Sequence, residues 1–240
     1  MKIAILGNGK MGQMIVQLAK KSGHEVILTV DKNNYSEIKD SDLKQVDIAI
    51  EFSAPIIAVK NIKWCIDMGV PVVCGTTGWL EKWDEVVDYC KSKNGSFFYS
   101  SNYSIGVNIF FNLNNYLAKL MNKFPEYEVS IEETHHVHKL DAPSGTAITA
   151  ANDILHNHSG YDNWMLQKCD ETKTRTIPIK ANRVGEVSGD HSIVYKSRVD
   201  EIKIAHSAYS REGFAKGVIK AAEFLYGKKG IFGMSDLLKF

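Results

Sequence analysis

A cluster of histidines beside a lysine is the part of this sequence with the clearest chemical potential. Three of the eight histidines, His135, His136 and His138, fall within four residues, and Lys139 follows them directly. A histidine can donate or accept a proton near neutral pH, and a lysine beside it can bind an anion. The cluster is therefore a candidate for acid–base chemistry on a negatively charged substrate.

The residues after this cluster have the pattern of a helix N-terminus. Residues 143–146 read Pro-Ser-Gly-Thr, with proline near the first turn and a hydroxyl side chain that can cap the helix. The free N–H groups at such an end bind carboxylates. His136, Lys139 and this N-terminus therefore predict a pocket for a small anion beside a proton-donating histidine, which suits the reduction of a small acid.

Two other interpretations of the cluster are open. A zinc site is disfavoured because adjacent histidines on a strand point to opposite faces, and the nearby acids and cysteines form no recognisable ligand set. We expect no metal. The second interpretation is that residues 135–139 are the polar end of a strand and have no catalytic role. Because His135 and His136 cannot both face one pocket from a regular strand, we predict that the strand ends or bends there.

A GxGxxG motif lies near the start of the chain, between an apolar run and a helical pattern. In this setting its glycines allow a tight turn, close approach of the backbone to a pyrophosphate and close packing of helix on strand. The alternative is a plain turn in a domain that binds nothing. The motif predicts a dinucleotide site that includes Gly7, Asn8, Gly9, Lys10, Met11 and Gly12.

An acid and a base follow the second predicted strand. Asp31 lies about 20 residues after the motif, where a carboxylate can bind the adenosine ribose hydroxyls and favour NADH. Lys32 either contacts the 2′-phosphate of NADPH or lies in solvent. An acid beside a base predicts that both cofactors, NADH and NADPH, are accepted.

The predicted helices and strands that position these motifs follow one pattern in the first hundred residues and another in the rest of the chain. The first hundred residues alternate strand and helix patterns, which are typical of a parallel sheet with helices on both faces. Strands are expected at residues 3–6, 25–30, 47–50, 70–74 and 96–99, and helices at 11–23, 56–68 and 79–93. The fold class is therefore α/β, with an N-terminal Rossmann-type parallel sheet.

The rest of the chain predicts an α+β domain with a mixed open sheet. Residues 126–136 alternate by twos, with Val129 and Ile131 on one face and Ser130 and Glu132 on the other. Further strands are expected at 174–179, 191–195 and 201–206, helices at 107–121, 146–155 and 214–225, and a polar loop at 156–173.

Composition limits the class of protein. The chain has 240 residues, enough for one large or two modest domains, and a net charge of +1, which argues against a nucleic-acid partner. Cys65, Cys74, Cys90 and Cys169 match neither a disulfide framework nor a zinc site and are expected as free thiols. No apolar stretch approaches ~18 residues. We expect a cytoplasmic protein without a membrane partner.

A family resemblance is carried by EETHHVHKLDAPSGTA at residues 132–147. This segment closely resembles the signature of the 4-hydroxy-tetrahydrodipicolinate reductase (dihydrodipicolinate reductase) family. Supporting segments, in the family's order and over nearly the whole chain, are CGTTGW, SNYSIGVN, RVGEVSGDH and KKGIFGMSDLL.

The resemblance implies an enzyme of diaminopimelate and lysine biosynthesis. It would reduce 4-hydroxy-tetrahydrodipicolinate, a small dicarboxylate, with NADH or NADPH. Residues 1–103 and 211–240 would bind the dinucleotide, and residues 104–210 would bind substrate and form a homotetramer. His135 would be the proton donor, with Lys139 a second catalytic group. Substrate contacts would be His136, Gly145 and Thr146, and the cofactor would be lined by Gly75, Thr76, Thr77, Ser100, Ser101, Asn102 and Tyr103.

Two other functions are weighed against this one. A dehydrogenase of another small amino or keto acid would share the first hundred residues, and only residues 135–146 argue against it. A nucleotide-sensing regulator would have no need to keep His135, Lys139 and Gly145 together. Arg183 and Arg211 could reach either a substrate or an interface, and the sequence does not decide between these roles.

Overall fold

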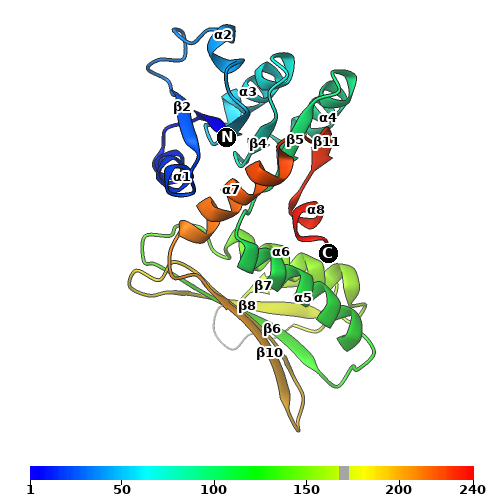
Figure 1. Ribbon diagram of the computed structural model, residues 1–240. Coiled ribbons are helices and arrows are strands. Elements are labelled where there is room, and N and C mark those ends of the chain that lie inside the picture. Colours follow the sequence, from blue (N-terminus) through cyan, green and yellow to red (C-terminus); the bar gives the residue numbers. More distant parts are fainter. Residues whose placement is uncertain (168–172) are drawn as a thin grey trace. The chain divides into compact units, whose positions relative to one another are not determined.

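The computed structural model describes residues 1–167 and 173–240, which form two compact units (Figure 1). The first unit consists of Met1–Ile105 and Glu212–Phe240, and the second of Gly106–Arg211. Cys65, Cys74 and Cys90 are buried free thiols, while the expectation for Cys169 lies outside the described residues. No helix in the described part of the chain is long and apolar enough to cross a membrane.

The first unit is built on a six-stranded sheet in which every strand pair is parallel. The strand order is β11-β5-β4-β3-β1-β2. This arrangement confirms the predicted Rossmann-type fold, because parallel strands joined by helices must form such a sheet. The strands are β1 (Lys2–Leu6), β2 (Glu25–Val30), β3 (Ile48–Glu51), β4 (Val72–Cys74), β5 (Ser96–Tyr99) and β11 (Gly230–Phe232).

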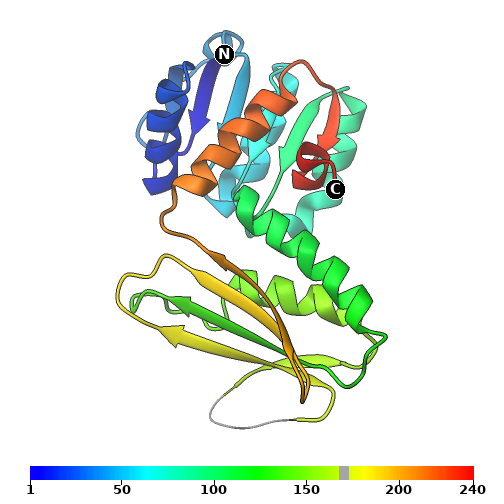
Figure 2. The same cartoon turned by 60° about the horizontal axis from the view of Figure 1, so that its bottom comes forward.

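Helices cover both faces of this sheet, as Figure 2 shows. Ile3 and Ile5 of β1 pack in the core that includes α1 (Lys10–Lys21), α7 (Glu212–Leu225) and α8 (Met234–Leu238). Ala4 and Leu6 belong to the opposite core, with α2, α3 and α4. Alternate strand residues thus serve the two cores. The remaining helices of the unit are α2 (Asp40–Leu43), α3 (Pro55–Asp67), the 3-10 turn η1 (Leu80–Lys82) and α4 (Trp83–Ser92).

The second unit contains a mixed sheet in the order β10-β9-β6-β8-β7. The central strand β6 pairs antiparallel with β9 and parallel with β8. Helices α5 (Ile105–Met121) and α6 (Gly145–Asn157) share one apolar core with the sheet. The mixed open sheet confirms the predicted α+β fold of this part. The strands are β6 (Glu128–His135), β7 (Asn163–Leu166), β8 (Thr176–Arg183), β9 (Asp190–Lys196) and β10 (Glu201–Ser207).

The prediction of a polar loop at residues 156–173 is wrong in its middle. Asn163–Leu166 forms β7, which pairs in parallel with β8 at the edge of the sheet. The strand is short and only partly buried, so it has no strong apolar alternation of its own. β7 forms because its backbone hydrogen-bonds to the neighbouring strand β8. The residue types within β7 give no indication of these bonds.

The strand predicted at residues 174–179 extends further than expected. β8 runs to Arg183, because its last residues continue to pair with β6, where His135 lies beside Arg183. Residues 180–183 are Lys-Ala-Asn-Arg, which have no apolar alternation. This extension matters for the site, since it brings Arg183 next to the histidine cluster.

Candidate active site

The inward face of β6 changes from apolar to polar toward its end. Val129, Ile131, Glu133 and His135 alternate along this face, and all four are buried. The strand ends at His135, and the chain then turns, as predicted from the difficulty of aiming two adjacent histidines into one pocket. Glu133 has no exposed surface, so its carboxylate requires partners within the protein.

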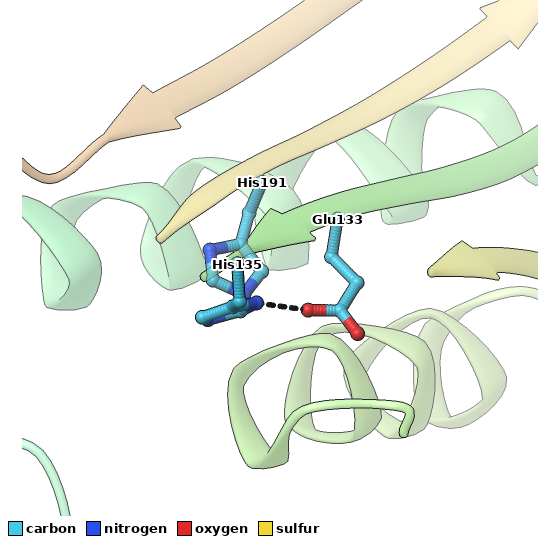
Figure 3. Close-up of side chains that lie close together, drawn as sticks. All are labelled: Glu133, His135 and His191. Carbon is cyan, nitrogen blue, oxygen red and sulfur yellow. Dashed lines mark ion pairs between the residues drawn. The ribbon is translucent and has the colours of Figure 1, made fainter. Parts of the chain in front are cut away.

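The three buried groups Glu133, His135 and His191 lie together at this strand end (Figure 3). The Oε2 of Glu133 forms an ion pair with Nδ1 of His135. His191 lies opposite Glu133 on the neighbouring strand β9, and its ring meets the His135 ring edge-on at a centroid distance of 5.1 Å. The candidate acid His135 is therefore held on two sides.

Arg183 holds the other oxygen of Glu133. Its Nη1 and Nη2 donate to Oε1 of Glu133 at 3.3 and 3.2 Å. The same guanidinium donates to the backbone carbonyls of Lys139 at 3.3 Å and Asp141 at 2.6 Å. Arg183, for which the sequence left the role open, thus links the buried carboxylate to the loop that carries Lys139.

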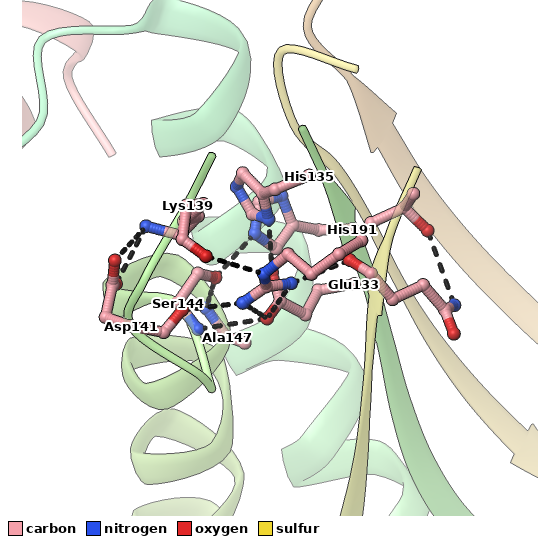
Figure 4. A network of polar contacts seen from close by, with 10 residues as sticks. Glu133, His135, Lys139, Asp141, Ser144, Ala147 and His191 are labelled. Carbon is pink, nitrogen blue, oxygen red and sulfur yellow. Dashed lines mark hydrogen bonds and ion pairs between the residues drawn. The ribbon is translucent and has the colours of Figure 1, made fainter. Parts of the chain in front are cut away.

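Ser144 joins this network to the start of α6 (Figure 4). Its side chain accepts a hydrogen bond from the N–H of Ala147 and so caps the helix, as the sequence pattern predicted. Its own N–H donates to Oε1 of Glu133 at 3.2 Å, and its hydroxyl lies 2.9 Å from Nε2 of His191. The first N–H groups of a helix have no partner within it, so the turn at Gly145 can bind an anion.

Lys139 lies beside this network and is partly exposed. Its ammonium group donates to both carboxylate oxygens of Asp141, at 2.8 and 2.7 Å. The hydrogen bond from Lys139 holds the pKa of Asp141 below its ordinary value. His136 is half-buried, whereas His138 is exposed and pairs with Glu186 at the surface. The structure therefore separates His138 from the buried part of the cluster.

Burial is the main influence on the pKa values of both imidazole groups at the site, those of His135 and His191. Desolvation lowers the pKa of His135; the Glu133 carboxylate opposes this effect, and the cations Lys139 and Arg183 add to it. Desolvation, together with His135, lowers the pKa of His191 to about 3. His191 is therefore a neutral hydrogen-bonding group at pH 7.

Glu133, His135 and His191 also form a possible metal-ligand set, which the sequence did not predict. Each offers one ligand atom, and these atoms lie within 4.8 Å of one another. Three such ligands suit a divalent transition metal. However, Arg183 already binds the only carboxylate of the set, and Lys139 adds a second positive charge nearby. The charges around the cluster favour a proton or an anion over a metal cation.

A cavity in the first unit lies at the carboxyl ends of β1, β2 and β3. It has a volume of about 670 Å³ and is lined by residues of all three strand ends. Such a crevice, where neighbouring strands lead in opposite directions across the sheet, is the usual ligand site of this fold. Of the predicted cofactor residues, the cavity lining includes Gly7, Asn8, Gly9, Asp31 and Lys32.

The glycines of the first loop fit a bound pyrophosphate. A Cβ on Gly12 would lie 2.0 Å from the carbonyl oxygen of Gly7, so the helix packs directly on the turn. A Cβ on Gly9 would meet nothing within 4 Å, and this residue caps α1 without a side-chain hydrogen bond. Gly9, which precedes the first residue of α1, lines the cavity, so a phosphate there would lie against the N-terminus of this helix.

The remaining predicted cofactor residues lie in this unit but outside the cavity lining. Gly75 follows β4 and packs against the ring of Phe52, which does line the cavity. Thr76 is buried, and Tyr103 lies in the core, where its hydroxyl donates to the carbonyl of Cys74 at 2.6 Å. The other members of this group are Lys10, Met11, Gly12, Thr77, Ser100, Ser101 and Asn102.

At the histidine site, Glu133 and His191 were not predicted as site residues, Arg183 was left without a decided role, and Ser144 was predicted only as a helix cap. The signal for Glu133 was present, since the alternation that buries Val129 also places this acid on the inward face. An acid at an inward position demands an internal partner. Arg183 and His191 are the first and last residues of the segment RVGEVSGDH, but nothing in that segment indicates that they contact Glu133, because they come from other strands.

The fold and the two sites together define a class, namely a two-domain oxidoreductase that uses a pyridine nucleotide. Residues 1–103 match the model of the dihydrodipicolinate reductase N-terminus, and residues 106–238 match that of the C-terminus. The chain belongs to the dihydrodipicolinate reductase family.

Individual relatives agree with this assignment. The chain is 46% identical to a 4-hydroxy-tetrahydrodipicolinate reductase of Christiangramia forsetii over 99% of its own length and 98% of the relative's. It is 30% identical to the protein of that name from Neisseria meningitidis serogroup B, over 99% and 97% of the two chains. A solved dipicolinate-bound dihydrodipicolinate reductase from Paenisporosarcina sp. TG-14 has the same fold, with a TM-score of 0.79 at 22% identity and 98% coverage of both chains.

Proposed function

We propose that this chain reduces 4-hydroxy-tetrahydrodipicolinate to tetrahydrodipicolinate, with loss of water, in the diaminopimelate route to lysine. The observation that carries the proposal is the convergence of a buried histidine, a lysine and a helix N-terminus at the end of β6, within a chain of this family. A dicarboxylate needs cations and N–H donors around it and a proton donor beside its ring.

In the proposed reaction, loss of water from the 4-hydroxy substrate leaves a C=C bond in the ring. One carbon of this bond receives hydride and His135 donates a proton to the other. The reduced nicotinamide, when bound, supplies that hydride. Lys139, His136 and the N–H groups of Gly145 and Thr146 bind a substrate carboxylate and hold the ring in place. Burial keeps the pKa of His135 low, and the negative charge of the substrate favours its protonated form once the complex forms.

The first unit is proposed to bind the dinucleotide and the second to bind the substrate. The phosphates would lie on the turn from Gly7 to Gly12, because Gly7, Asn8 and Gly9 line the cavity just before α1 begins. Asp31 and Lys32 would contact the adenosine ribose, with either NADH or NADPH accepted. The loops 75–77 and 100–103 would complete the cofactor site from the ends of β4 and β5.

An absorbance assay with freshly prepared 4-hydroxy-tetrahydrodipicolinate tests the proposed function. Oxidation of NADH or NADPH that depends on this substrate is expected, with inhibition by pyridine-2,6-dicarboxylate, a planar dicarboxylate analogue. Oxidation only with another amino or keto acid would reassign the substrate. Cofactor binding without any turnover would instead support a nucleotide sensor.

Replacement of Asp31 by alanine is expected to raise KM for NADH about tenfold and to change KM for NADPH much less. The reason is that the carboxylate accepts hydrogen bonds from the ribose hydroxyls only when the 2′-position carries no phosphate. Steady-state kinetics with both cofactors measure the effect. Asp31→Asn is the control, because it keeps the side-chain oxygen that accepts the N–H of Asn33 at 2.8 Å. Equal weakening of both cofactors in Asp31→Ala would remove this residue from the ribose site.

The quaternary structure and location follow the same family expectation. We propose a homotetramer in the cytoplasm, with the second unit forming the interface. The second unit is chosen as the interface because, among the described residues, α5 and α6 are the only helices that share the core of its sheet. Light scattering of the purified protein should give four times 26.9 kDa, and a monomeric mass would contradict the proposal.

A further inference from the structure

Glu133 is the most deeply buried charged group at the site, and the mechanism proposed above does not use it. Its carboxylate has no exposed surface, yet it contacts the Arg183 guanidinium, the Ser144 N–H and the His135 ring. Burying a carboxylate is unfavourable unless each oxygen is paired. A core position on β6 would be more stable with an apolar residue, as at Ile131, so a function for this acid is indicated.

We propose that Glu133 is the positioning residue for His135, and that Arg183 holds Glu133 in place for this task. Glu133 binds Nδ1 of the ring, so that Nε2 is the nitrogen that exchanges its proton with the substrate. This inference rests on the proposed function, in which His135 is the proton donor, and it deepens that function by naming what orients the donor.

The orientation of the His135 ring follows from its two neighbours. The carboxylate of Glu133 contacts Nδ1 of the ring. A carboxylate in this position favours the tautomer that carries hydrogen on Nδ1. The opposite nitrogen lies over Gly189, where a Cβ would come within 3.0 Å of Nε2. Because residue 189 is a glycine, no side chain from this position contacts Nε2. One nitrogen is thus held and the other left available.

Arg183 couples this orientation to the rest of the site. It donates two hydrogen bonds to Glu133 and further bonds to the carbonyls of Lys139 and Asp141. Arg183 therefore binds both Glu133, which contacts His135, and the loop that carries Lys139. Such a planar group with several donors fixes relative position better than a flexible ammonium group.

Four charged or titratable groups face His135. Glu133, on the same strand, favours the protonated ring, while Lys139 from the loop and Arg183 from β8 oppose it. His191 from β9 is neutral at pH 7 because its pKa is about 3. Loss of the Glu133 charge would leave only the opposing cations, so the pKa of His135 would fall further.

Glu133→Gln is expected to lower kcat about tenfold at pH 7 and to leave KM for the nucleotide unchanged. The fall of kcat with rising pH, which follows deprotonation of His135, should move to lower pH by about one unit. Activity should therefore be partly recovered in acid. Glu132→Gln is the matched control: Glu132 is the adjacent acid on the exposed face of β6, bound to Asn182 at 2.8 Å, and its loss should change neither kcat nor the pH profile.

A measurement on the unaltered protein covers the case in which Glu133→Gln fails to fold. Nitrogen-15 NMR of the imidazole groups should show neutral His135 with hydrogen on Nδ1. Hydrogen on Nε2 instead, or a folded Glu133→Gln protein with an unchanged pH profile, would overturn the inference. A reduced kcat without a shifted profile would do the same, since that pattern indicates only a structural role.

Two further results distinguish a positioning role of Glu133 from a failure of the proposed function and from a metal site. If the unaltered enzyme does not turn over the substrate, the proposed function fails, whereas the NMR tautomer still tests the contact between Glu133 and His135. If chelation with EDTA abolishes activity and Zn²⁺ restores it, Glu133, His135 and His191 are metal ligands and the inference is overturned. We expect no effect of EDTA.

Discussion

Replacing His135 with glutamine is expected to lower kcat about a hundredfold or more, the usual effect of losing a general acid. The side chain is buried beside His191, which is neutral at pH 7 because its pKa is lowered to about 3 and so cannot replace His135 as a proton donor. Glutamine is uncharged at all relevant pH values and cannot donate a proton to carbon. Because the described residues that line the cavity proposed for the nucleotide all belong to the first unit, the Kd for NADH or NADPH should remain nearly constant.

Steady-state kinetics and a fluorescence titration with NADH measure these two effects separately. His138→Gln is the matched control, since His138 lies on the same turn but is exposed and pairs with Glu186 at 3.3 Å. This control should retain full activity. Equal rates for His135→Gln and the unaltered protein would refute the assignment of His135 as proton donor.

Replacing Lys139 with alanine is expected to lower kcat/KM for the dicarboxylate about a hundredfold, shared between a higher KM and a lower kcat. A charge-assisted hydrogen bond contributes about 1.5–3 kcal/mol, which corresponds to a factor of roughly ten to more than a hundred. The loss is enlarged here by Asp141, whose carboxylate is held by Lys139 and would be left unpaired near the substrate. Repulsion between two anions then adds to the lost attraction.

Kinetics with varied substrate at saturating nucleotide measure the effect of Lys139→Ala. Lys180→Ala is the control, because Lys180 is an exposed lysine on β8 that pairs only loosely with Glu132 at 3.5 Å. In a protein that also carries Asp141→Asn, the effect of Lys139→Ala should be smaller. Unchanged kinetics for Lys139→Ala would exclude this residue from the site.

The sequence alone was sufficient for the fold class and for the main motifs. Apolar periodicity of two and of 3.6 residues is local, so alternation in β6 and the helical stripe of α7 predicted elements that the structure contains. The cap at Ser144 likewise depends on neighbouring residues, whereas the turn at Gly7 also needs a glycine because a Cβ there would lie 2.1 Å from the carbonyl oxygen of Phe52. The strand β7 was missed because its formation depends on pairing with β8, and its own four residues carry little pattern.

What surrounds His135 was decided by the tertiary structure. Glu133 is close to it in the chain, but Arg183 and His191 come from strands about fifty residues later, placed there by the registers of β8 and β9 against β6. Strand register is set by the whole sheet and its core, not by any short segment. The sequence thus predicted which residue is the candidate proton donor, whereas only the folded sheet determined what holds that residue and how its charge is balanced.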